Sequence, residues 1–292
     1  SYLLRFTPED VCRAIERDRV TVFAGVPTMY LALLNFPDAD RYHLGSLKYC
    51  ICGGAPMSVE AMRAFEKKYN MSVLEGYGLT ETSPLAVTNR TFRPKKPTSI
   101  GLPITGVDVK IFDERDGEVP RGESGEIVIR GPNVMKGYYK HPQATAAVMR
   151  HGWFHTGDVG MMDEEGYIYV VGRTKEMILR GGFNVSPREV EEVLYAHPAI
   201  LEAAVIGIPD KCYGEEVKAF IVLKPDYHLT SAEVIAYCKA HLAAFKYPRI
   251  VEFSSSLPKG PTGKILKKEL REKERGKQGD KKRHELDDEK GE

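Results

Sequence analysis

The chain has 292 residues, of which 42% are hydrophobic and 28% charged, and its formal net charge is +1. These values are typical of a globular protein with one large domain or two ordinary ones. They exclude a strong overall field that would attract nucleic acid or an anionic membrane, so we expect no nucleic acid partner and at most peripheral membrane contact.

The sequence also argues against membrane insertion and export. No apolar run approaches the roughly 20 residues of a membrane-spanning helix, and the first ten residues lack the basic and apolar segments of a signal peptide. Five scattered cysteines without a CxxC pair favour free thiols in a reducing compartment, so we expect a cytoplasmic protein. Cys50 and Cys52 are expected on one face of a strand, packed as small apolar side chains.

Residues 1–100 alternate between helix and strand signals. Thr7 and Ser58 are candidate helix caps, and Pro27 is a candidate first helical residue. The expected helices end at Arg17, Leu34 and Tyr69, and the expected strands are 20–24, 47–52 and 71–74. Strands separated by single helices imply a parallel sheet with helices on its faces. We therefore predict a partial parallel α/β subdomain over residues 1–100.

The pattern changes twice in the rest of the chain. Residues 101–173 contain short alternating segments at 107–111, 125–130 and 166–171, which predict a β-rich, barrel-like subdomain. Residues 174–271 predict a small α+β domain with helices at 187–196 and 231–243 and strands at 203–208 and 219–224. Residues 272–292 are almost entirely charged or polar, and we expect disorder beyond Arg275. The predicted fold class is thus α/β followed by α+β.

Three segments contain residue types suited to nucleotide chemistry. The first is GYGLTET at residues 76–82, directly after an expected parallel strand, where open α/β sheets bind ligands. Tyr77, next to Gly78, offers a flat face to a base, Thr80 a hydroxyl to a phosphate, and Glu81 an oxygen ligand to Mg²⁺. An ordinary Gly-Tyr-Gly turn would have the same sequence.

The second segment is GWFHTGD, which ends at Asp158, with Arg173 following fifteen residues later. A carboxylate can accept hydrogen bonds from a ribose diol, and an arginine can donate to the same sugar or to a phosphate. A turn aspartate paired to an arginine on the next strand is an equally good interpretation.

The third segment is PKGPTGKILKKEL, residues 258–270. Gly260 and Gly263 flank Pro261, so we expect a mobile loop that presents Lys264 before a helix begins around Ile265. Such a lysine could deliver a cation to phosphoryl and carboxylate oxygens in a transition state. The alternative is a solvated lysine ahead of a charged helix.

Together and in this order, these segments resemble the adenylate-forming superfamily of acyl-CoA synthetases, adenylation domains and beetle luciferases. The resemblance covers about residues 4–271 and includes GGAP at 53–56, GRTKEMILRGGFNVSPREVEE at 172–192 and PTGK at 261–264. GYGLTETSP and LAAFKYPRIVEF look most similar to bacterial long-chain fatty-acid–CoA ligases. The resemblance implies ATP-dependent activation of a fatty acid to an acyl-adenylate and its transfer to coenzyme A, with Mg²⁺ as metal.

The resemblance also implies residue roles. Tyr77 would stack on adenine, Thr80 would bond the α-phosphate, Glu81 would ligate Mg²⁺, and Lys264 would stabilise charge during adenylation. Asp158 and Arg173 would hold the ribose. Gly53, Gly54 and Ala55 would pack around the base. Lys175 would be the hinge between the two domains. Gly181, Gly182 and Phe183 would line the path of the coenzyme A arm. Glycines suit the last role because a narrow arm must pass close to the backbone.

One departure from the family pattern leaves alternatives open. The family has a Ser/Thr/Gly-rich phosphate loop upstream of these segments, which is not found in this sequence. We therefore expect the carboxyl-terminal half of a ligase, natural or shortened, which could need the upstream half as a partner and be inactive alone. A non-catalytic or split-enzyme fragment and an aryl or short-chain acid ligase are the alternatives. Stretches 26–30 and 76–79 are mostly neutral, which suits an apolar acyl group; the acyl chain length and the oligomeric state are not predicted.

Overall fold

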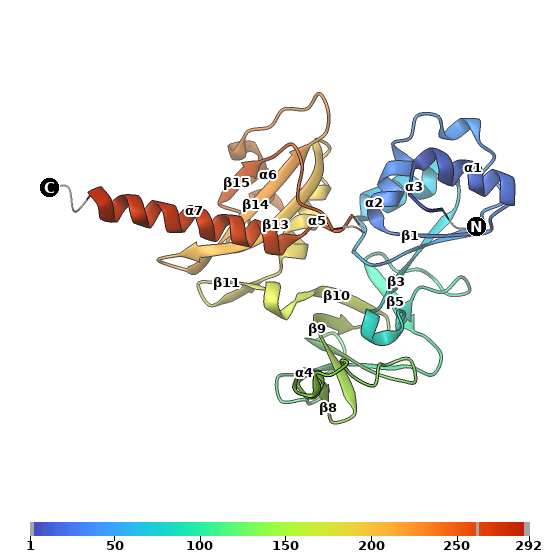
Figure 1. Ribbon diagram of the computed structural model, residues 1–292, viewed down its shortest axis with the longest axis horizontal. Helices are drawn as coiled ribbons and strands as arrows, with labels where there is room; N and C mark the ends of the chain where they lie inside the picture. Colours follow the sequence, from blue (N-terminus) through green and yellow to red (C-terminus); the bar gives the residue numbers. More distant parts are fainter. Residues whose placement is uncertain (1–2, 261–262, 289–292) are drawn as a thin grey trace. The chain divides into compact units, whose positions relative to one another are not determined.

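The computed structural model describes residues 3–260 and 263–288, with side chains as far as residue 277 (Figure 1). The chain divides into two compact units, residues 1–174 and 175–292. The sequence-based boundary lies after residue 173.

The first unit begins with three helices and three strands in alternation. In chain order these are α1 (Pro8–Asp18), β1 (Val22–Gly25), α2 (Pro27–Leu34), β2 (Tyr49–Cys52), α3 (Val59–Tyr69) and β3 (Ser72–Tyr77), and a short additional helix, η1 (Ala39–Arg41), lies between α2 and β2. Local capping explains two helix starts: the Thr7 hydroxyl accepts a hydrogen bond from Asp10 N at 3.1 Å, and that of Ser58 accepts one from Ala61 N at 3.3 Å.

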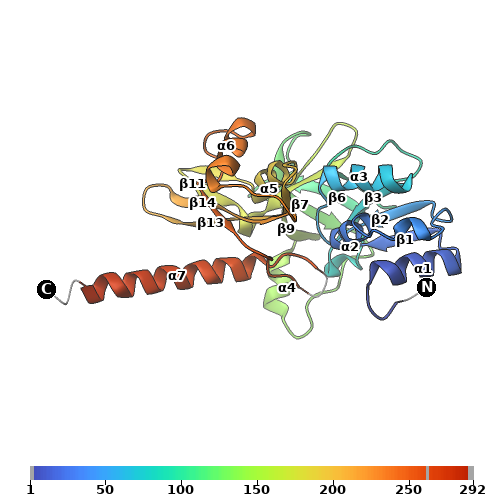
Figure 2. The same cartoon turned by 90° about the horizontal axis from the view of Figure 1, so that it is seen from above.

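The strands β1, β2 and β3 are parallel neighbours, as Figure 2 shows. Residues of all three helices pack into one core with residues of β2 and β3. Cys50 and Cys52 are both in this core and both are buried free thiols. The core thus holds in place the carboxyl ends of β2 and β3, from which two of the candidate loops extend.

The sheet continues into antiparallel strands. After the short helix η2 (Thr80–Thr82), these are β4 (Val87–Thr88), β5 (Ser99–Pro103), β6 (Asp108–Phe112), β7 (Ser124–Arg130), β8 (Met149–Arg150), β9 (Trp153–Met162) and β10 (Ile168–Arg173), with α4 (Pro142–Val148) between β7 and β8. The strand order is β1-β2-β3-β4-β5-β10-β9-β7-β6, and β8 pairs with β9. β5 runs across the boundary that we placed after residue 100, so the ladder connects the parallel and β-rich parts.

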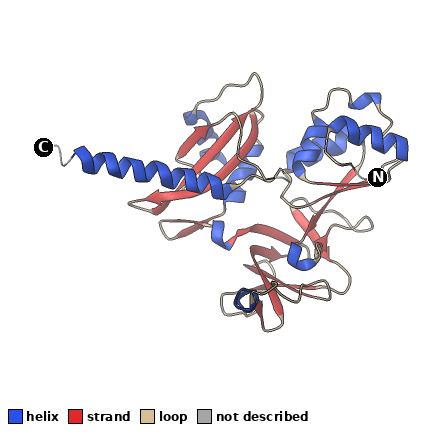
Figure 3. Cartoon of the chain, in the orientation of Figure 1, coloured by secondary structure: helices blue, strands red, loops and turns tan. Residues whose placement is uncertain are grey.

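The second unit is a smaller α+β fold. Following η3 (Thr174–Glu176), it contains β11 (Ile178–Arg180), β12 (Phe183–Val185), α5 (Pro187–Tyr195), β13 (Ile200–Asp210), β14 (Gly214–Leu223), α6 (Ser231–His241), β15 (Ile250–Phe253) and α7 (Lys267–Asp288). Its sheet has the order β12-β11-β14-β13, and β15 pairs with β14 in parallel. Figure 3 draws the strands in red and the helices in blue. The predicted order along the chain, with a parallel α/β part first, then a β-rich part and then an α+β part, is confirmed.

The tail differs from our expectation. We expected disorder beyond Arg275, whereas α7 continues to Asp288; residues 289–292 lie outside the described residues. Lysine, arginine, glutamate and glutamine have high helix propensities, and Leu270, which is buried, attaches the first turns of α7 to the sheet. The charged composition that suggested disorder therefore also suits a helix, provided that the first turns of the helix pack against the sheet.

Candidate nucleotide and acyl-transfer site

Two glycine-rich loops meet at one edge of the parallel strands. Cys52 of β2 lies opposite Glu75 of β3, so the residues that follow them, Gly53 and Gly76, are neighbours. A Cβ at Gly53 would lie 3.1 Å from the carbonyl oxygen of Gly76. Gly54 has a φ of +80°, which favours glycine, and the partly exposed Ala55 follows it. The structure therefore brings the predicted 53–55 loop against the loop that contains Tyr77.

Gly78 has a structural reason to be glycine. A Cβ at this position would lie 1.8 Å from the carbonyl oxygen of Pro84, so no larger residue fits without moving the backbone. The buried Thr82 closes the same turn, because its hydroxyl accepts a hydrogen bond from Leu79 N at 2.9 Å. This fixed turn presents Thr80, whose side chain is exposed, and Glu81, which is partly exposed.

Glu81 has a partner that the sequence did not indicate. The Tyr138 hydroxyl donates to Glu81 Oε1 at 2.8 Å. Burial, followed by the hydrogen bond to Glu81, raises the pKa of Tyr138, so its hydroxyl stays protonated as a donor. The two residues are 57 positions apart, and no local pattern could have linked them. Because the bond engages one carboxylate oxygen, it fixes the direction of the other.

Tyr77, Asp158 and Arg173 form the central cluster of the first unit. The Tyr77 hydroxyl donates to Asp158 Oδ2 at 2.6 Å, and Arg173 Nε donates to Asp158 Oδ1 at 2.7 Å. The Asp158 side chain is 6% exposed, whereas that of Arg173 is 47% exposed. Burial and the neighbouring Asp158 carboxylate raise the pKa of Tyr77 well above its usual value, so its hydroxyl remains a donor.

The strands explain this meeting. Asp158 lies on β9 and Arg173 on β10, and the two residues are directly opposite each other in the antiparallel ladder. Tyr77 is the last residue of β3, so three strands contribute to one cluster. The sequence analysis gave, as its alternative, an aspartate paired to an arginine on the next strand. The structure contains this pair, and the pairing is compatible with ligand binding by the same carboxylate.

The residues also allow for a magnesium ion. Among the described residues no group of three or more His, Cys, Asp or Glu side chains could hold a metal. Mg²⁺ is commonly bound by one or two carboxylates plus phosphate oxygens rather than by a protein cage. A single carboxylate such as Glu81, with one oxygen already oriented by Tyr138, fits that kind of site.

One stretch that we placed next to the acyl group belongs partly to the core. Tyr30 is fully buried, and its hydroxyl donates to Ile51 O at 2.8 Å. Its ring packs edge-on against Phe65, with centroids 5.0 Å apart. Tyr30 therefore holds α2 and α3 to the sheet.

In the second unit, Gly181 and Gly182 form the turn of the β11–β12 hairpin. Their φ angles are +57° and +82°, the left-handed conformation that two-residue hairpin turns require. Gly181 N donates to Tyr213 O at 2.8 Å. Beside the turn, the half-exposed Phe183 stacks on Phe245 with ring centroids 4.6 Å apart. A narrow, exposed backbone turn next to an aromatic surface results.

A buried ion pair supports this turn. Arg180 binds the Glu216 carboxylate with two hydrogen bonds of 2.6 and 2.8 Å, and its guanidinium lies 4.3 Å from the ring centroid of Tyr213. Both charged residues are less than a tenth exposed. Such a paired and stacked arginine restricts the hairpin far more than an exposed salt bridge would.

Lys264 and Lys175 are both exposed. Gly260 N donates to Lys264 O at 2.9 Å, and Lys259 forms an isolated bridge with Ile265, so the ends of this loop lie side by side. Pro261, within the predicted mobile segment, lies outside the described residues. The helix α7 begins at Lys267, two residues later than we expected. Lys175 is part of η3, at the division between the two units.

Comparison with known proteins agrees with these observations. Residues 2–139 match the family described as AMP-binding enzyme, and residues 189–264 match the AMP-binding enzyme C-terminal domain. The chain is 45% identical to a long-chain-fatty-acid–CoA ligase of Bacillus subtilis over 93% of its own length and 49% of the relative's. It is 43% identical to a feruloyl-CoA synthase of an Amycolatopsis species, over 91% of this chain and 54% of that protein.

The fold comparison points the same way. The ATP-bound structure of MatB from Rhodopseudomonas palustris superposes with a TM-score of 0.87 at 37% identity, over 93% of this chain and 54% of that one. The chain thus spans about half the length of the curated relatives it matches.

Proposed function

We propose, because this chain belongs to the AMP-binding enzyme family, that it provides the ribose-binding and acyl-transfer residues of an AMP-forming fatty-acid–CoA ligase. Such an enzyme joins a fatty acid to the AMP part of ATP with release of pyrophosphate, and then transfers the acyl group to coenzyme A with release of AMP. The observation that supports this most is the Asp158 cluster.

Asp158 is suited to a ribose diol. A carboxylate offers about four acceptor positions, and the described residues use two of them, for Tyr77 and Arg173. Two positions therefore remain for two neighbouring hydroxyls of one ligand. Because Asp158 is already fixed by its neighbours, ordering it on binding costs little. Tyr77 would place its ring against the base, with the 53–55 loop beside it.

The phosphate end of the nucleotide is assigned to the 80–81 turn. Thr80 would donate its hydroxyl to the α-phosphate, and Glu81 would hold Mg²⁺, oriented by Tyr138. Bound Mg²⁺ would neutralise phosphate charge and so ease attack of the acid's carboxylate. Lys264 would add a cation for the charge that develops in this step.

Thioester formation is assigned to the second unit. The 181–182 turn has no side chains, so the pantetheine arm of coenzyme A could pass along its backbone with Phe183 at its side. Lys175, beside the division between the units, would be the hinge about which the second unit turns between the two steps. ATP and coenzyme A, together with five free thiols, fit the cytoplasmic location that we expect.

An aromatic acid is the second candidate substrate, and the specific observation is the 43% identity to a feruloyl-CoA synthase. Both candidates use the same nucleotide residues and differ only in the acyl pocket. A substrate series that includes long-chain fatty acids and ferulate separates them.

The test replaces the matching segment of the Bacillus subtilis ligase with this chain. We expect the purified chimera to form acyl-CoA from a long-chain acid, ATP and coenzyme A, and to need roughly ten- to a hundredfold more ATP for this when Asp158→Ala is introduced. Asp108→Ala, which removes an exposed ion pair with Arg130 on the same sheet, is the control and should retain activity. A folded chimera that releases no AMP with any acid, while the parent ligase is active, contradicts the proposal.

A further inference from the structure

The pairing of β9 with β7 is interrupted over residues 156–158, the segment that ends in Asp158. β7 and β9 pair at Val128 with His155 and again at Glu126 with Val159. Only Ile127 lies between the two pairs on β7, whereas Thr156, Gly157 and Asp158 lie between them on β9. β9 therefore bulges away from β7 in the segment that places the Asp158 carboxylate. Bulges of this kind redirect a side chain and leave backbone groups without ladder partners.

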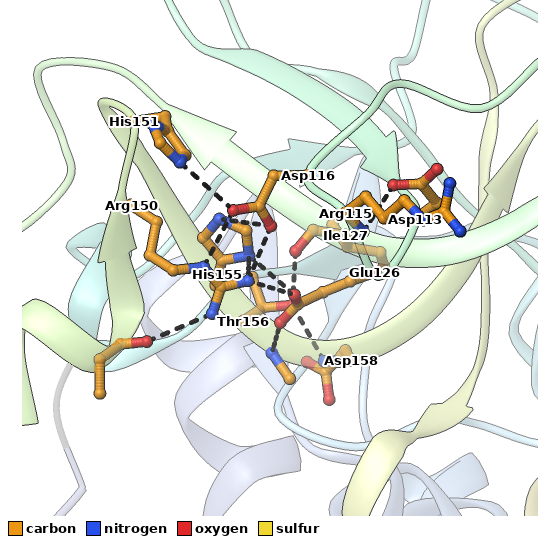
Figure 4. Close-up of polar contacts among 12 residues, drawn as sticks. Asp113, Arg115, Asp116, Glu126, Ile127, Arg150, His151, His155, Thr156 and Asp158 are labelled. Atoms are coloured by element: carbon orange, nitrogen blue, oxygen red, sulfur yellow. Dashed lines mark hydrogen bonds and ion pairs between the residues drawn. The ribbon is translucent and has the colours of Figure 1, made fainter.

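Side chains replace the lost ladder bonds, as the close-up in Figure 4 shows. Glu126 Oε1 accepts a hydrogen bond from Gly157 N at 2.8 Å. The Thr156 hydroxyl donates to Ile127 O at 2.8 Å and accepts from Asp158 N at 3.0 Å. Gly157 has a φ of +71°, a conformation that needs such support for the bulge to keep one shape.

The other oxygen of Glu126 holds the start of the bulge. Glu126 Oε2 lies 2.7 Å from Nδ1 of His155, whose side chain is only 3% exposed. Arg150 Nη2 lies 2.8 Å from the same ring nitrogen and 2.9 Å from Asp116 Oδ1. A single carboxylate thus fixes the residues on either side of Thr156, with a buried imidazole and an arginine as its support.

We infer that Glu126 is the positioning residue of the ribose site: it holds the 156–158 bulge in the one shape that directs the Asp158 carboxylate at the nucleotide. This inference rests on the proposed function. Glu126 would touch neither the nucleotide nor the acid, and its effect would pass entirely through Asp158. Errors of about 1 Å in such placement are enough to weaken a binding or catalytic contact strongly.

A positioning role makes a prediction that a purely structural role does not. Losing Glu126 should weaken recognition of the ribose hydroxyls and leave recognition of the rest of ATP unchanged. In the chimera, Glu126→Ala should raise the KM for ATP about tenfold with little change in kcat, as expected when a contact made equally in ground and transition states is lost. The preference for ATP over 2′-deoxy-ATP and 3′-deoxy-ATP should fall to the level of Asp158→Ala.

Three variants make the test selective. Glu126→Gln keeps an acceptor for Gly157 N and should restore most of the ribose preference. Thr156→Val removes the acceptor for Asp158 N while keeping the side chain's shape, and should reduce the same preference. Glu118→Ala, which removes an exposed ion pair with Lys110, is the control and should change nothing. Thermal unfolding of each variant checks that it is folded. If Glu126→Ala does not fold, the ribose preferences of Glu126→Gln and Thr156→Val test the inference instead.

The outcomes separate the two proposals. If the unaltered chimera neither binds ATP nor makes acyl-CoA, the proposed function fails, and this inference fails with it. If the unaltered chimera is active and Glu126→Ala weakens ATP and both deoxy analogues by the same factor, only the positioning role is overturned. An additional loss of ribose preference when Glu126→Ala is added to Asp158→Ala would also overturn it, because nothing would remain for Glu126 to act through.

Discussion

At the Asp158 cluster, one carboxylate joins two other side chains, and the proposed function adds ribose binding to this structural role. Its bonds to Tyr77 and Arg173 satisfy a nearly buried charge, which would otherwise be costly. The proposed function assigns the remaining acceptor positions of this side chain to the ribose. A residue that looks merely paired can therefore be a pre-organised ligand site.

Asp158→Ala should weaken binding of both ATP and AMP. A lost hydrogen bond to a charged group costs about 1.5–3 kcal/mol, which corresponds to roughly ten- to a hundredfold in affinity. Calorimetry on the chimera measures this, with Asp108→Ala as the control. Unchanged nucleotide affinity would mean that Asp158 serves only the ladder between β9 and β10.

Lys264→Ala should abolish adenylate formation and leave thioester formation from supplied acyl-adenylate largely intact. Losing such a charge contact costs about 2.7–4 kcal/mol, or about a hundred- to a thousandfold in rate. The two half-reactions are assayed separately in the chimera. Lys268→Ala, which alters an exposed lysine four residues later, is the control. An equal loss in both half-reactions contradicts the assigned role.

Gly78→Ala should destabilise the fold in addition to any effect on the nucleotide, because its methyl group would overlap the Pro84 carbonyl oxygen. Overpacking of this kind costs about 1–3 kcal/mol. Chemical denaturation measures the loss. Gly45→Ala is the matched control, since a Cβ there meets nothing within 4 Å. Equal stability of the two variants would show that the turn around Gly78 adjusts easily.

At the scale of elements, an ion network joins α7 to the sheet of the second unit. Glu252 of β15 accepts hydrogen bonds from Lys218 of β14 at 2.7 Å and from Lys277 of α7 at 2.9 Å. Lys218 also pairs with Glu274 of α7 at 2.7 Å, and both residues are buried. The early part of α7 is thus fixed by charge as well as by Leu270.

This network predicts a pH dependence. Partial burial favours the neutral form of Glu252, but the two lysines outweigh it and lower its pKa from 4.5 to about 2. Because the pKa is lower in the folded state, the stabilisation is present above pH 4.5 and is lost as the pH falls towards 2. The contribution at neutral pH is on the order of 1–3 kcal/mol.

Glu252→Gln should therefore lower protection of the β14 and β15 amides in hydrogen exchange at pH 6, and the difference from the parent chain should vanish near pH 2. Glu272→Gln, on the exposed side of the same helix, is the control and should show no such pH-dependent difference. A difference that stays constant down to pH 2 would contradict the assignment to the Glu252 carboxylate.

At the scale of the whole molecule, the two units have separate cores. The second unit builds its core from α5, α6 and the strands β13 and β14, and places a smaller cluster under α7. None of the helices in the described part of the chain combines the length and apolar composition that crossing a bilayer requires. The division after Thr174 falls among exposed residues, including Lys175.

Limited trypsin digestion should therefore cut first at Arg173 or Lys175 and leave the second unit as a stable fragment, because exposed residues between compact units are the most accessible. Mass spectrometry identifies the fragments, and circular dichroism of the isolated fragment tests whether it folds alone. Lys175→Gln combined with Arg173→Gln should slow the first cut. A single resistant core spanning residues 173–175 would show that the units unfold together.

The sequence by itself determined the features that depend on neighbours along the chain. The caps at Thr7 and Ser58 and the residue types within each of the three motifs all depend on residues within a few positions. Local patterns were enough to predict α1, α2, α3, α5, α6, the start of α7, about half of the strands and the family, but not α4 or β9. The sequence also supplied the chemistry of Tyr77, Glu81 and Asp158, because side-chain type does not depend on folding.

Only the tertiary structure decided which of these residues meet, and in which geometry. The Tyr77–Asp158 bond joins residues 81 positions apart, and the Glu126–Gly157 bond joins residues 31 apart on two strands whose register slips between them. The sequence indicates residues 153–158 only as a motif. That these residues form part of a strand depends on their pairing with β7 and β10. Likewise, α7 forms where a charged sequence alone suggested disorder, because Leu270 and the Lys218 network hold its first turns. Long-range pairing supplies the free energy that fixes these features, and no local pattern contains it.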